Sequence, residues 1–385
     1  MDEKKEKVLA RVREEIERID KKENSIFFFV VDTKGVASGS LEYIYKLAKI
    51  AKEDGYNVGM LYQAEKDDEF VGVEGWLGKE YSELPHYNVA TEQVDITPGD
   101  ILFIPEIFSS VMNQTKKLPC KRIAIMQNFD YMVEQMPFAA QWGDFGVLEC
   151  ITNTKDNAEL VDGVFPYVRT TVITPYIDKV FGDTKEPKQL IVNIVASDQS
   201  DINKIVKPFY WKYPSFKWVS FKDLRGFSKE EFAKALREAA VTVWVDENTS
   251  FGYSALEAMK SGSIVIAKMP KRTLPWTEEA TDTSVTKFKG CCVWFEDFNT
   301  VQRQIATVVR AWMTDSVPEK LIETAKETAS EYTEEKTAKA FTEYLENVLS
   351  ARKQEMDALV KNFSKESLDT SSMPNTNEAK EEEGE

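Results

Sequence analysis

Residues 241–267, VTVWVDENTSFGYSALEAMKSGSIVIA, constrain the possible fold more than any other stretch of the chain. Residues 241–245 are a short apolar run rich in β-branched side chains, which is typical of a buried strand. Residues 253–260 contain helix formers and stop at Ser261-Gly262, where glycine accepts the left-handed backbone that ends a helix. Residues 264–267 supply a second buried strand. Strand, loop, helix and strand form a parallel crossover, so the loop lies at the carboxyl edge of a sheet, where α/β proteins bind ligands.

The composition excludes some classes of function. The 385-residue chain carries a formal net charge of −16, whereas a nucleic-acid partner requires a basic surface. Four cysteines without metal-ligand spacing and a single histidine, His86, indicate reduced thiols and no structural zinc site. The N-terminus is charged, and the apolar runs are shorter than the ~20 residues of a membrane span. We therefore expect a cytoplasmic protein with no membrane span, no metal and no nucleic-acid partner.

Strands and helices alternate in two series along the chain. The first series begins with the apolar run 25–32 and includes strands near 100–107 and 121–127. The polar segment 175–188, which contains two prolines, separates it from a second series that begins at 189–195. The pattern predicts an α/β protein with two Rossmann-like domains whose parallel sheets face each other across a cleft.

The loop that opens the 253–260 helix is the first candidate ligand site. Residues 250–253 precede or begin the helix, so backbone N–H groups and the positive end of the helix dipole face this point. A diphosphate suits such a site. Glu257 lies about one turn further along, where its carboxylate can accept hydrogen bonds from vicinal hydroxyls such as those of a ribose.

A second loop, after the strand at 25–32, contains Gly35 and Gly39, where the backbone can approach a ligand, and Ser40, which can cap the following helix. The spacing differs from the dinucleotide fingerprint G-x-G-x-x-G, and no acidic residue ends the next strand. A nicotinamide site is therefore disfavoured. The alternative is that the glycines only make the turn.

Residues 249–257 and the AMKSGSIVIA that follows resemble the donor-binding signature of retaining GT-B glycosyltransferases of the family 4 kind. In that signature a Glu, a Phe-Gly, a second Glu and Ala-Met-x-x-Gly recur. The resemblance implies the GT-B fold and transfer of a sugar from a nucleotide-sugar donor to a glycan or other acceptor, with retention of configuration. It covers residues 25–340 in outline and is specific in 249–267. The family's first Glu falls at Thr249 in this chain, and Glu247 lies two residues earlier.

The resemblance also implies how the chain is divided, because the last helices of GT-B proteins cross back to the first domain. The expected parts are a charged N-terminal helix (residues 1–24), an acceptor domain (25–177), a nucleotide-sugar donor domain (178–333), a returning C-terminal helix (334–361) and a disordered acidic tail (362–385). The tail is polar, and residues 364–385 carry seven acidic residues against two lysines.

Candidate catalytic residues follow from the resemblance. Related transferases often carry a His after the strand at 121–127, where this chain has Gln127-Asn128, as in certain bacterial rhamnosyl-type relatives. Amides can hydrogen-bond sugar hydroxyls but cannot act as a base near neutral pH. Asp130 is the nearest carboxylate. Asn128, Asp130 and Thr249 are therefore the catalytic candidates.

The donor-binding candidates combine the loop and its helix with two cations. The family clamps the diphosphate with an Arg and a Lys after the first strand of the second domain, where Lys204 matches best here and no Arg occurs. Arg225 lies where the family contacts the nucleobase, and it is equally plausible as a solvated surface residue. The donor-binding set is Glu257, Lys204, Ser250, Phe251, Gly252, Tyr253, Ser254 and Arg225, and the loop with Gly35, Gly39 and Ser40 faces the phosphates or the acceptor. No cofactor is expected besides the nucleotide-diphosphate sugar.

One alternative from a different class is a catalytically inactive GT-B module that binds a glycan or a protein partner. Thr249 in place of Glu, the absent His and the missing Arg favour it. Glu257 can also be a structural group of the core. Binding of nucleotide sugars discriminates between the transferase and the inactive module.

Overall fold

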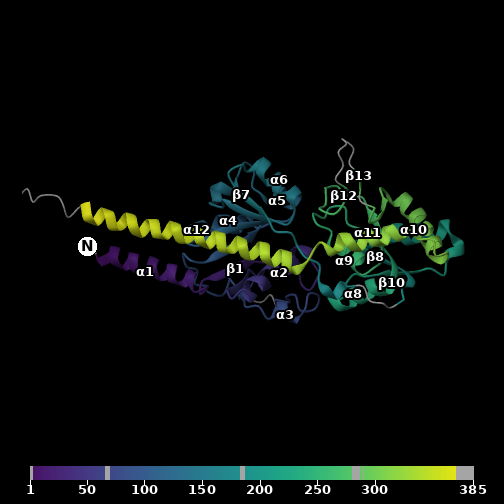
Figure 1. The fold of residues 1–385 in the computed structure, drawn as a ribbon, viewed down its shortest axis with the longest axis horizontal. Helices are drawn as coiled ribbons and strands as arrows, with labels where there is room; N and C mark the ends of the chain where they lie inside the picture. The colour runs from purple at the N-terminus through teal and green to yellow at the C-terminus, as the bar shows by residue number, and fades with distance from the viewer. Residues whose placement is uncertain (1–2, 66–69, 183–186, 280–286, 289, 370–385) are drawn as a thin grey trace, which may run out of the picture.

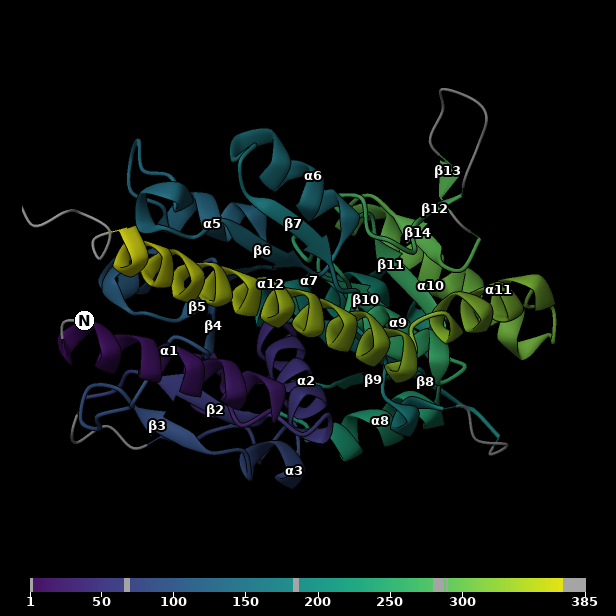
Figure 2. The ribbon, with the colours of Figure 1, turned by 60° about the vertical axis from the view of Figure 1, so that its left-hand side comes forward.

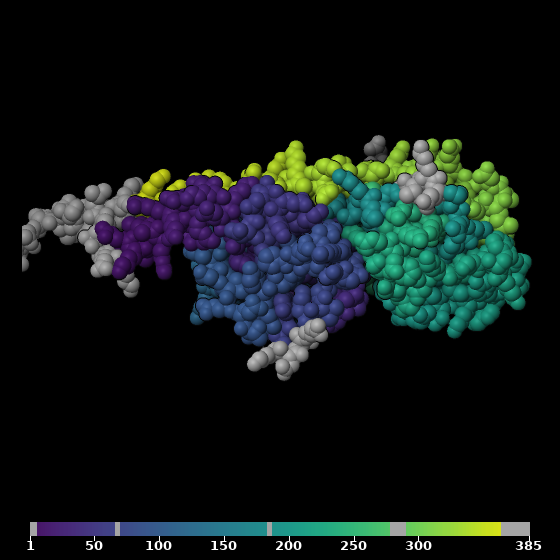
Figure 3. All heavy atoms as spheres, turned by 90° about the horizontal axis from the view of Figure 1, so that it is seen from below, coloured from purple at the N-terminus to yellow at the C-terminus, as the bar shows by residue number. Residues whose placement is uncertain are grey.

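The computed structural model describes residues 3–65, 70–182, 187–279, 287–288 and 290–369. The chain forms two lobes that lie end to end, with a long helix running along the N-terminal lobe (Figure 1). Seen from below, the N-terminal lobe and the C-terminal lobe meet along one junction (Figure 3). In the described residues, no helix combines the length and the apolar character needed to cross a membrane.

The N-terminal lobe is built on a seven-stranded sheet in which every neighbouring pair is parallel. Its strand order is β3-β2-β1-β4-β5-β6-β7. Along the chain these strands are β1 Ser25–Phe29, β2 Asn57–Tyr62, β3 His86–Asn88, β4 Ile101–Pro105, β5 Lys121–Met126, β6 Glu149–Thr152 and β7 Arg169–Val172. The central strands are buried throughout, as the apolar run at 25–32 predicted.

Helices cover both faces of this sheet, so each face has its own apolar core. The helices of this part are α1 Glu3–Asp20, α2 Gly39–Glu53, α3 Lys79–Ser82, α4 Ser109–Gln114, α5 Phe129–Gln135 and α6 Lys155–Val164, with 3-10 turns η1 Thr115–Lys117 and η2 Trp142–Phe145. Between residues 64 and 99 the described chain contains only the short helix α3 and the short strand β3.

The C-terminal lobe repeats the same architecture around a smaller parallel sheet, in the order β14-β11-β10-β8-β9. Its strands are β8 Gln189–Ala196, β9 Ser220–Asp223, β10 Ala239–Val245, β11 Ile264–Lys268 and β14 Val293–Phe295. A two-stranded antiparallel pair, β12 Glu278–Glu279 and β13 Lys287–Phe288, stands apart from it. The helices are α7 Gln199–Lys212, α8 Lys229–Glu238, α9 Tyr253–Lys260, α10 Phe298–Met313 and α11 Glu319–Ser330, with turns η3 Lys179–Phe181 and η4 Pro214–Phe216.

The long helix α12, Glu334–Asp369, returns to the N-terminal lobe (Figure 2). Phe341, Leu345 and Leu349 are buried in the same core as β1 and α2. Lys353 pairs with Asp20 at the end of α1, with Nζ 2.6 Å from Oδ1. The helix continues to Asp369, although the sequence predicted disorder from 362, and the rest of the expected tail lies outside the described residues.

Helix caps show where local sequence decides the boundaries. Ser228 and Glu231 form the reciprocal capping box at the start of α8. The prediction that Ser40 caps the helix after β1 is wrong, because α2 begins at Gly39 and Ser38 is its N-cap. The Ser38 hydroxyl accepts a hydrogen bond from the Leu41 N–H, so the helix starts two residues earlier than a Ser40 cap would allow.

Candidate functional site

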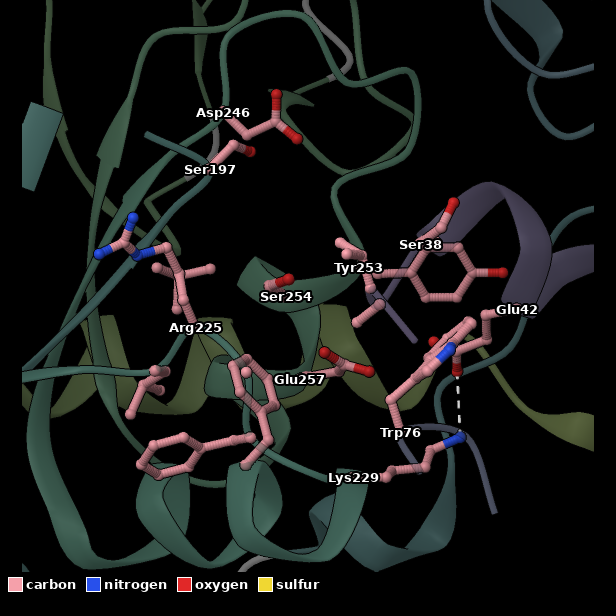
Figure 4. Close-up of a pocket in the computed structure, with 18 of the residues that line it drawn as sticks. Ser38, Glu42, Trp76, Ser197, Arg225, Lys229, Asp246, Tyr253, Ser254 and Glu257 are labelled. Carbon is pink, nitrogen blue, oxygen red and sulfur yellow. Dashed lines mark hydrogen bonds and ion pairs between the residues drawn. The ribbon is translucent and has the colours of Figure 1, made fainter. Parts of the chain in front are cut away.

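A pocket of about 420 Å³ lies between the two lobes at the carboxyl edges of their sheets (Figure 4). The N-terminal lobe contributes the start of α2 and Trp76, and the C-terminal lobe contributes the ends of β8 and β10, the loop before α8, and α9. Its polar and charged lining comprises Ser38, Glu42, Trp76, Ser197, Arg225, Lys229, Asp246, Tyr253, Ser254 and Glu257. This is the location at which parallel α/β sheets bind ligands.

Glu257 points into this pocket from the second turn of α9 (Figure 4). Its side chain is almost fully buried, yet the carboxyl has no hydrogen-bond or ion-pair partner among the described residues. Burial, assisted by the negative charge of Glu42, raises the pKa of Glu257 to about 8. A buried carboxyl without a partner is costly to retain. A ligand that donates hydrogen bonds would provide the missing partners.

A buried charge cluster, formed by Glu42, Lys46, Asp178 and Lys229, closes the side of the pocket next to Glu257. Lys46 is 1% exposed and its Nζ lies 2.7 Å from Glu42 Oε1 and 2.9 Å from Asp178 Oδ2. Lys229 binds the same two carboxylates, with Nζ 3.1 Å from Glu42 Oε1. Burial opposes the charge on Asp178, but Lys46 and Lys229 outweigh it and lower the pKa of Asp178 to about 2.

The charge cluster joins three parts of the chain. Glu42 and Lys46 belong to α2 of the N-terminal lobe, Asp178 follows β7 in the segment between the lobes, and Lys229 opens α8 of the C-terminal lobe. Two cations balance two carboxylates, so an ionised Glu257 beside them would carry an uncompensated negative charge. Burial therefore dominates at Glu257 and raises its pKa, whereas at Asp178 the two paired lysines outweigh burial and lower the pKa.

Helix α9 begins at Gly252, whose backbone is left-handed with φ +78°. The Gly252 N–H donates to the Thr249 hydroxyl at 3.1 Å, which leads the chain into the helix. No side chain of the described residues caps the first turn, and Tyr253 and Ser254 of that turn line the pocket. The positive end of the helix dipole therefore faces the pocket beside Ser254.

Gly252→Ala is expected to destabilise the C-terminal lobe by about 3 kcal/mol. A Cβ would lie 2.9 Å from Trp276, so overpacking adds to the strain of a left-handed alanine. Gly226→Ala is the matched control, because Gly226 has φ +76° and nothing within 4 Å of its Cβ position. It is expected to cost about 1 kcal/mol. Urea unfolding measures the loss of stability of both variants. Equal losses would show that the Trp276 side chain can move aside without an energetic cost.

Besides the charge cluster, further side-chain contacts cross between the lobes at their junction. Asn128 Nδ2 donates to the Asn248 carbonyl at 3.1 Å, and Asn153 Nδ2 donates to Ser250 Oγ at 2.9 Å. Arg272 pairs with Asp130, with Nη2 2.6 Å from Oδ1. Since Asn248 precedes Thr249, the structure brings Asn128 and the Thr249 loop together at the lobe junction.

Glu106 supports the N-terminal side of this junction. It follows β4, is 3% exposed, and its Oε1 accepts a hydrogen bond from the Asn128 N–H at 2.8 Å. Burial raises the pKa of Glu106 to about 7, although the backbone N–H groups around it act in the opposite direction. Asn128 in turn caps α5, so this buried carboxyl fixes the residue that reaches across to the other lobe.

The structure gathers some predicted site residues and separates others. Glu257, Tyr253, Ser254, Arg225 and Gly39 line the pocket. The remaining donor-site and loop candidates do not: Ser250, Phe251, Gly252, Lys204, Gly35 and Ser40. Phe251 is buried in the core of the C-terminal lobe. Lys204 is exposed on α7, where its Nζ lies 2.8 Å from Asp201.

Sequence reasoning missed Glu42, Trp76, Lys229 and Asp246 of the pocket. Glu42 and Lys46 carried a usable signal, because charged residues four apart on an otherwise apolar helix face indicate a buried pair. Lys229 directly follows the N-cap Ser228 of α8, so the local sequence marks it only as the start of a helix. Trp76 lies in an irregular segment without periodicity, so only the tertiary structure could place it in the pocket.

Comparison with known proteins places this fold. No protein-family model matches the sequence. The chain is 25% identical over 264 residues to an alpha-1,6-glucosyltransferase of Actinobacillus pleuropneumoniae serotype 7, covering 65% of this chain and 73% of that protein.

Several solved structures have a similar fold. Sucrose-phosphate synthase from Thermosynechococcus elongatus superimposes with a TM-score of 0.57 at 13% identity, covering 85% of this chain and all of that one. The pneumococcal O-GlcNAc transferase GtfA, in complex with UDP and GlcNAc, has a TM-score of 0.55 at 8% identity over 85% of this chain and 99% of that one. S. aureus TarM, in a complex that includes UDP, has a TM-score of 0.58 at 10% identity over 83% of this chain and 99% of that one. The chain therefore has the GT-B fold, and its sequence is similar to that of a glucosyltransferase.

Proposed function

We propose that the protein is a glycosyltransferase that moves a hexosyl or deoxyhexosyl group from a nucleotide-sugar donor to a glycan or other acceptor. The observation that carries this proposal is Glu257, a buried carboxyl without a partner in a pocket between two GT-B lobes. The vicinal hydroxyls of a ribose supply the hydrogen-bond donors that this carboxyl lacks. The similarity to a glucosyltransferase and the UDP held by two structural relatives support the same function.

The diphosphate of the donor would lie at the start of α9. The positive end of the α9 dipole, beside Ser254, provides one positive group, and the Arg225 guanidinium, which pairs with Asp223, provides a second on the opposite wall of the pocket (Figure 4). Charge that develops on the departing diphosphate would be stabilised by these fixed groups, which take the place of a metal ion. Retention of configuration is proposed from the resemblance of residues 249–267 to retaining enzymes.

Asn128, Asp130 and Thr249 are proposed to lie beside the transferred sugar. The Asn128–Asn248 hydrogen bond brings Asn128 close to Thr249 at the lobe junction. Asn128 can position sugar hydroxyls through its amide. Asp130 is held by Arg272 of the other lobe. The acceptor would then enter from the N-terminal lobe.

Calorimetry against UDP-, GDP- and ADP-sugars tests the proposed function. Binding of one donor, followed by its slow hydrolysis with release of the nucleoside diphosphate, supports the transferase. The second candidate function is an inactive module that binds a glycan or a protein, and the use of the Thr249 hydroxyl to hold Gly252 favours it. If the protein bound none of these nucleotides, the result would support the inactive module and reject the transferase.

Arg225→Ala is expected to weaken nucleoside diphosphate binding about tenfold, because it removes a cation from the pocket wall. Lys204→Ala is the matched control and should change the affinity less than twofold, since Lys204 is exposed outside the pocket lining. Titration calorimetry at low and moderate salt measures both. A larger loss for Lys204→Ala would restore the sequence-based assignment of Lys204 as the phosphate clamp.

A further inference from the structure

Trp76 is, together with Glu257 and Tyr253, one of the buried pocket groups that lack a hydrogen-bond partner among the described residues. It belongs to the segment between β2 and α3 and enters the pocket from the N-terminal lobe, across from Glu257 (Figure 4). Its side chain is 7% exposed, and its Nε1 has no hydrogen-bond acceptor in the part of the chain that the structure describes. Backbone hydrogen bonds from Trp76 and Leu77 to the Val73 carbonyl hold the segment in place.

Trp76 and Glu257 are complementary in kind. The indole Nε1–H is only a donor, and hydrogen bonds donated by a ligand favour the ionised Glu257 carboxylate, which is only an acceptor. Buried polar groups are nearly always satisfied, so these two groups and the Tyr253 hydroxyl, which can donate or accept, indicate a ligand that both accepts and donates. A hydroxyl does both, because its oxygen accepts while its hydrogen is donated. The neighbouring cation Lys229 is already bound to Glu42 and Asp178.

We propose that Trp76 is a specificity-determining residue for the ribose of the donor. In this arrangement Glu257 accepts the hydroxyl hydrogens of the ribose, and Trp76 Nε1 donates to one of the same hydroxyl oxygens. Each lobe then contributes one contact to a single vicinal diol. The inference rests on the proposed function and deepens it, because the substrate class becomes ribonucleotides bound by both lobes rather than by the C-terminal lobe alone.

Trp76→Phe is the decisive variant, because it keeps an aromatic ring and removes the N–H. Trp211→Phe is the control, since Trp211 is 76% exposed and lies outside the pocket lining. Calorimetry with UDP, GDP and ADP, and with their 2′,3′-dideoxy forms, gives the affinity of each protein for each ligand. Thermal melting of each variant reports whether it is folded.

For the best ribonucleotide, Trp76→Phe is expected to weaken binding about tenfold, with less than a twofold change for its dideoxy form. Trp211→Phe should change neither. Equal weakening of both ligands, or no weakening of either, would overturn the role of Trp76 and leave the proposed function standing. Failure of the unmodified protein to bind any of the three ribonucleotides would overturn both.

Discussion

Glu257→Gln is expected to stabilise the protein at alkaline pH while it weakens binding of the nucleoside diphosphate. The pKa of Glu257 is about 8 in the folded state and near 4.5 in the unfolded state. Between these values the folded state binds one more proton, so stability falls as pH rises from 4.5 to 8 and is constant above. A shift of this size corresponds to about 5 kcal/mol. Glutamine cannot ionise, so the variant does not lose this stability as the pH rises.

Melting temperatures of the two proteins should therefore nearly coincide at pH 5 and differ by several degrees at pH 9. Binding of the nucleoside diphosphate should weaken at least tenfold, because hydrogen bonds from the ribose hydroxyls favour an ionised Glu257 and the glutamine amide cannot ionise. Glu230→Gln on the exposed surface of α8 is the control for both measurements. A variant that melts far below the wild type at all pH values would show Glu257 to be a structural group of the core.

Lys46→Met is expected to reduce the free energy of unfolding by about 3–5 kcal/mol. The change leaves Glu42 and Asp178 buried with one cation where two now balance them, and breaking a buried ion pair from one side costs this much. Lys49→Met on the same helix is the matched control, because Lys49 is 28% exposed and its pairs are at the surface. It should cost less than about 1 kcal/mol.

Urea unfolding at pH 7 measures both variants. Adding Asp178→Asn to Lys46→Met should recover part of the loss, since it removes one of the unbalanced carboxylates. A Lys46→Met protein as stable as the wild type would show that the charge cluster is not the electrostatic link between the lobes.

The fold could be predicted from the sequence because its signals are local and repeated. Residues 253–260 contain helix formers followed by Ser-Gly, and α9 has these bounds in the structure. The apolar runs at 25–32 and 241–245 predicted buried parallel strands, and β1 and β10 confirm them. The two Rossmann-like sheets and the GT-B arrangement follow from this alternation and from the resemblance of 249–267.

The pocket was only partly predictable, because it is assembled from both lobes. Glu257 follows from its spacing after Gly252 within one element. Trp76 and Lys229 reach the pocket only once the lobes are docked, and no local pattern marks them. Lys204 was chosen as the nearest cation in sequence, but α7 directs it to Asp201 at the surface. The pocket lining instead contains Arg225, from the loop after β9, and Lys229 of the charge cluster.

The return of α12 to the N-terminal lobe has a consequence for biosynthesis. Phe341, Leu345 and Leu349 complete a core whose other members include β1 and α2, near the beginning of the chain. While the ribosome is still making the second lobe, the first lobe therefore exposes an apolar face that its own chain has not yet covered. Domains ordinarily fold as they emerge, N-terminal first. Here the first lobe to be synthesised is the last to be finished, because its core is complete only after α12 has been made.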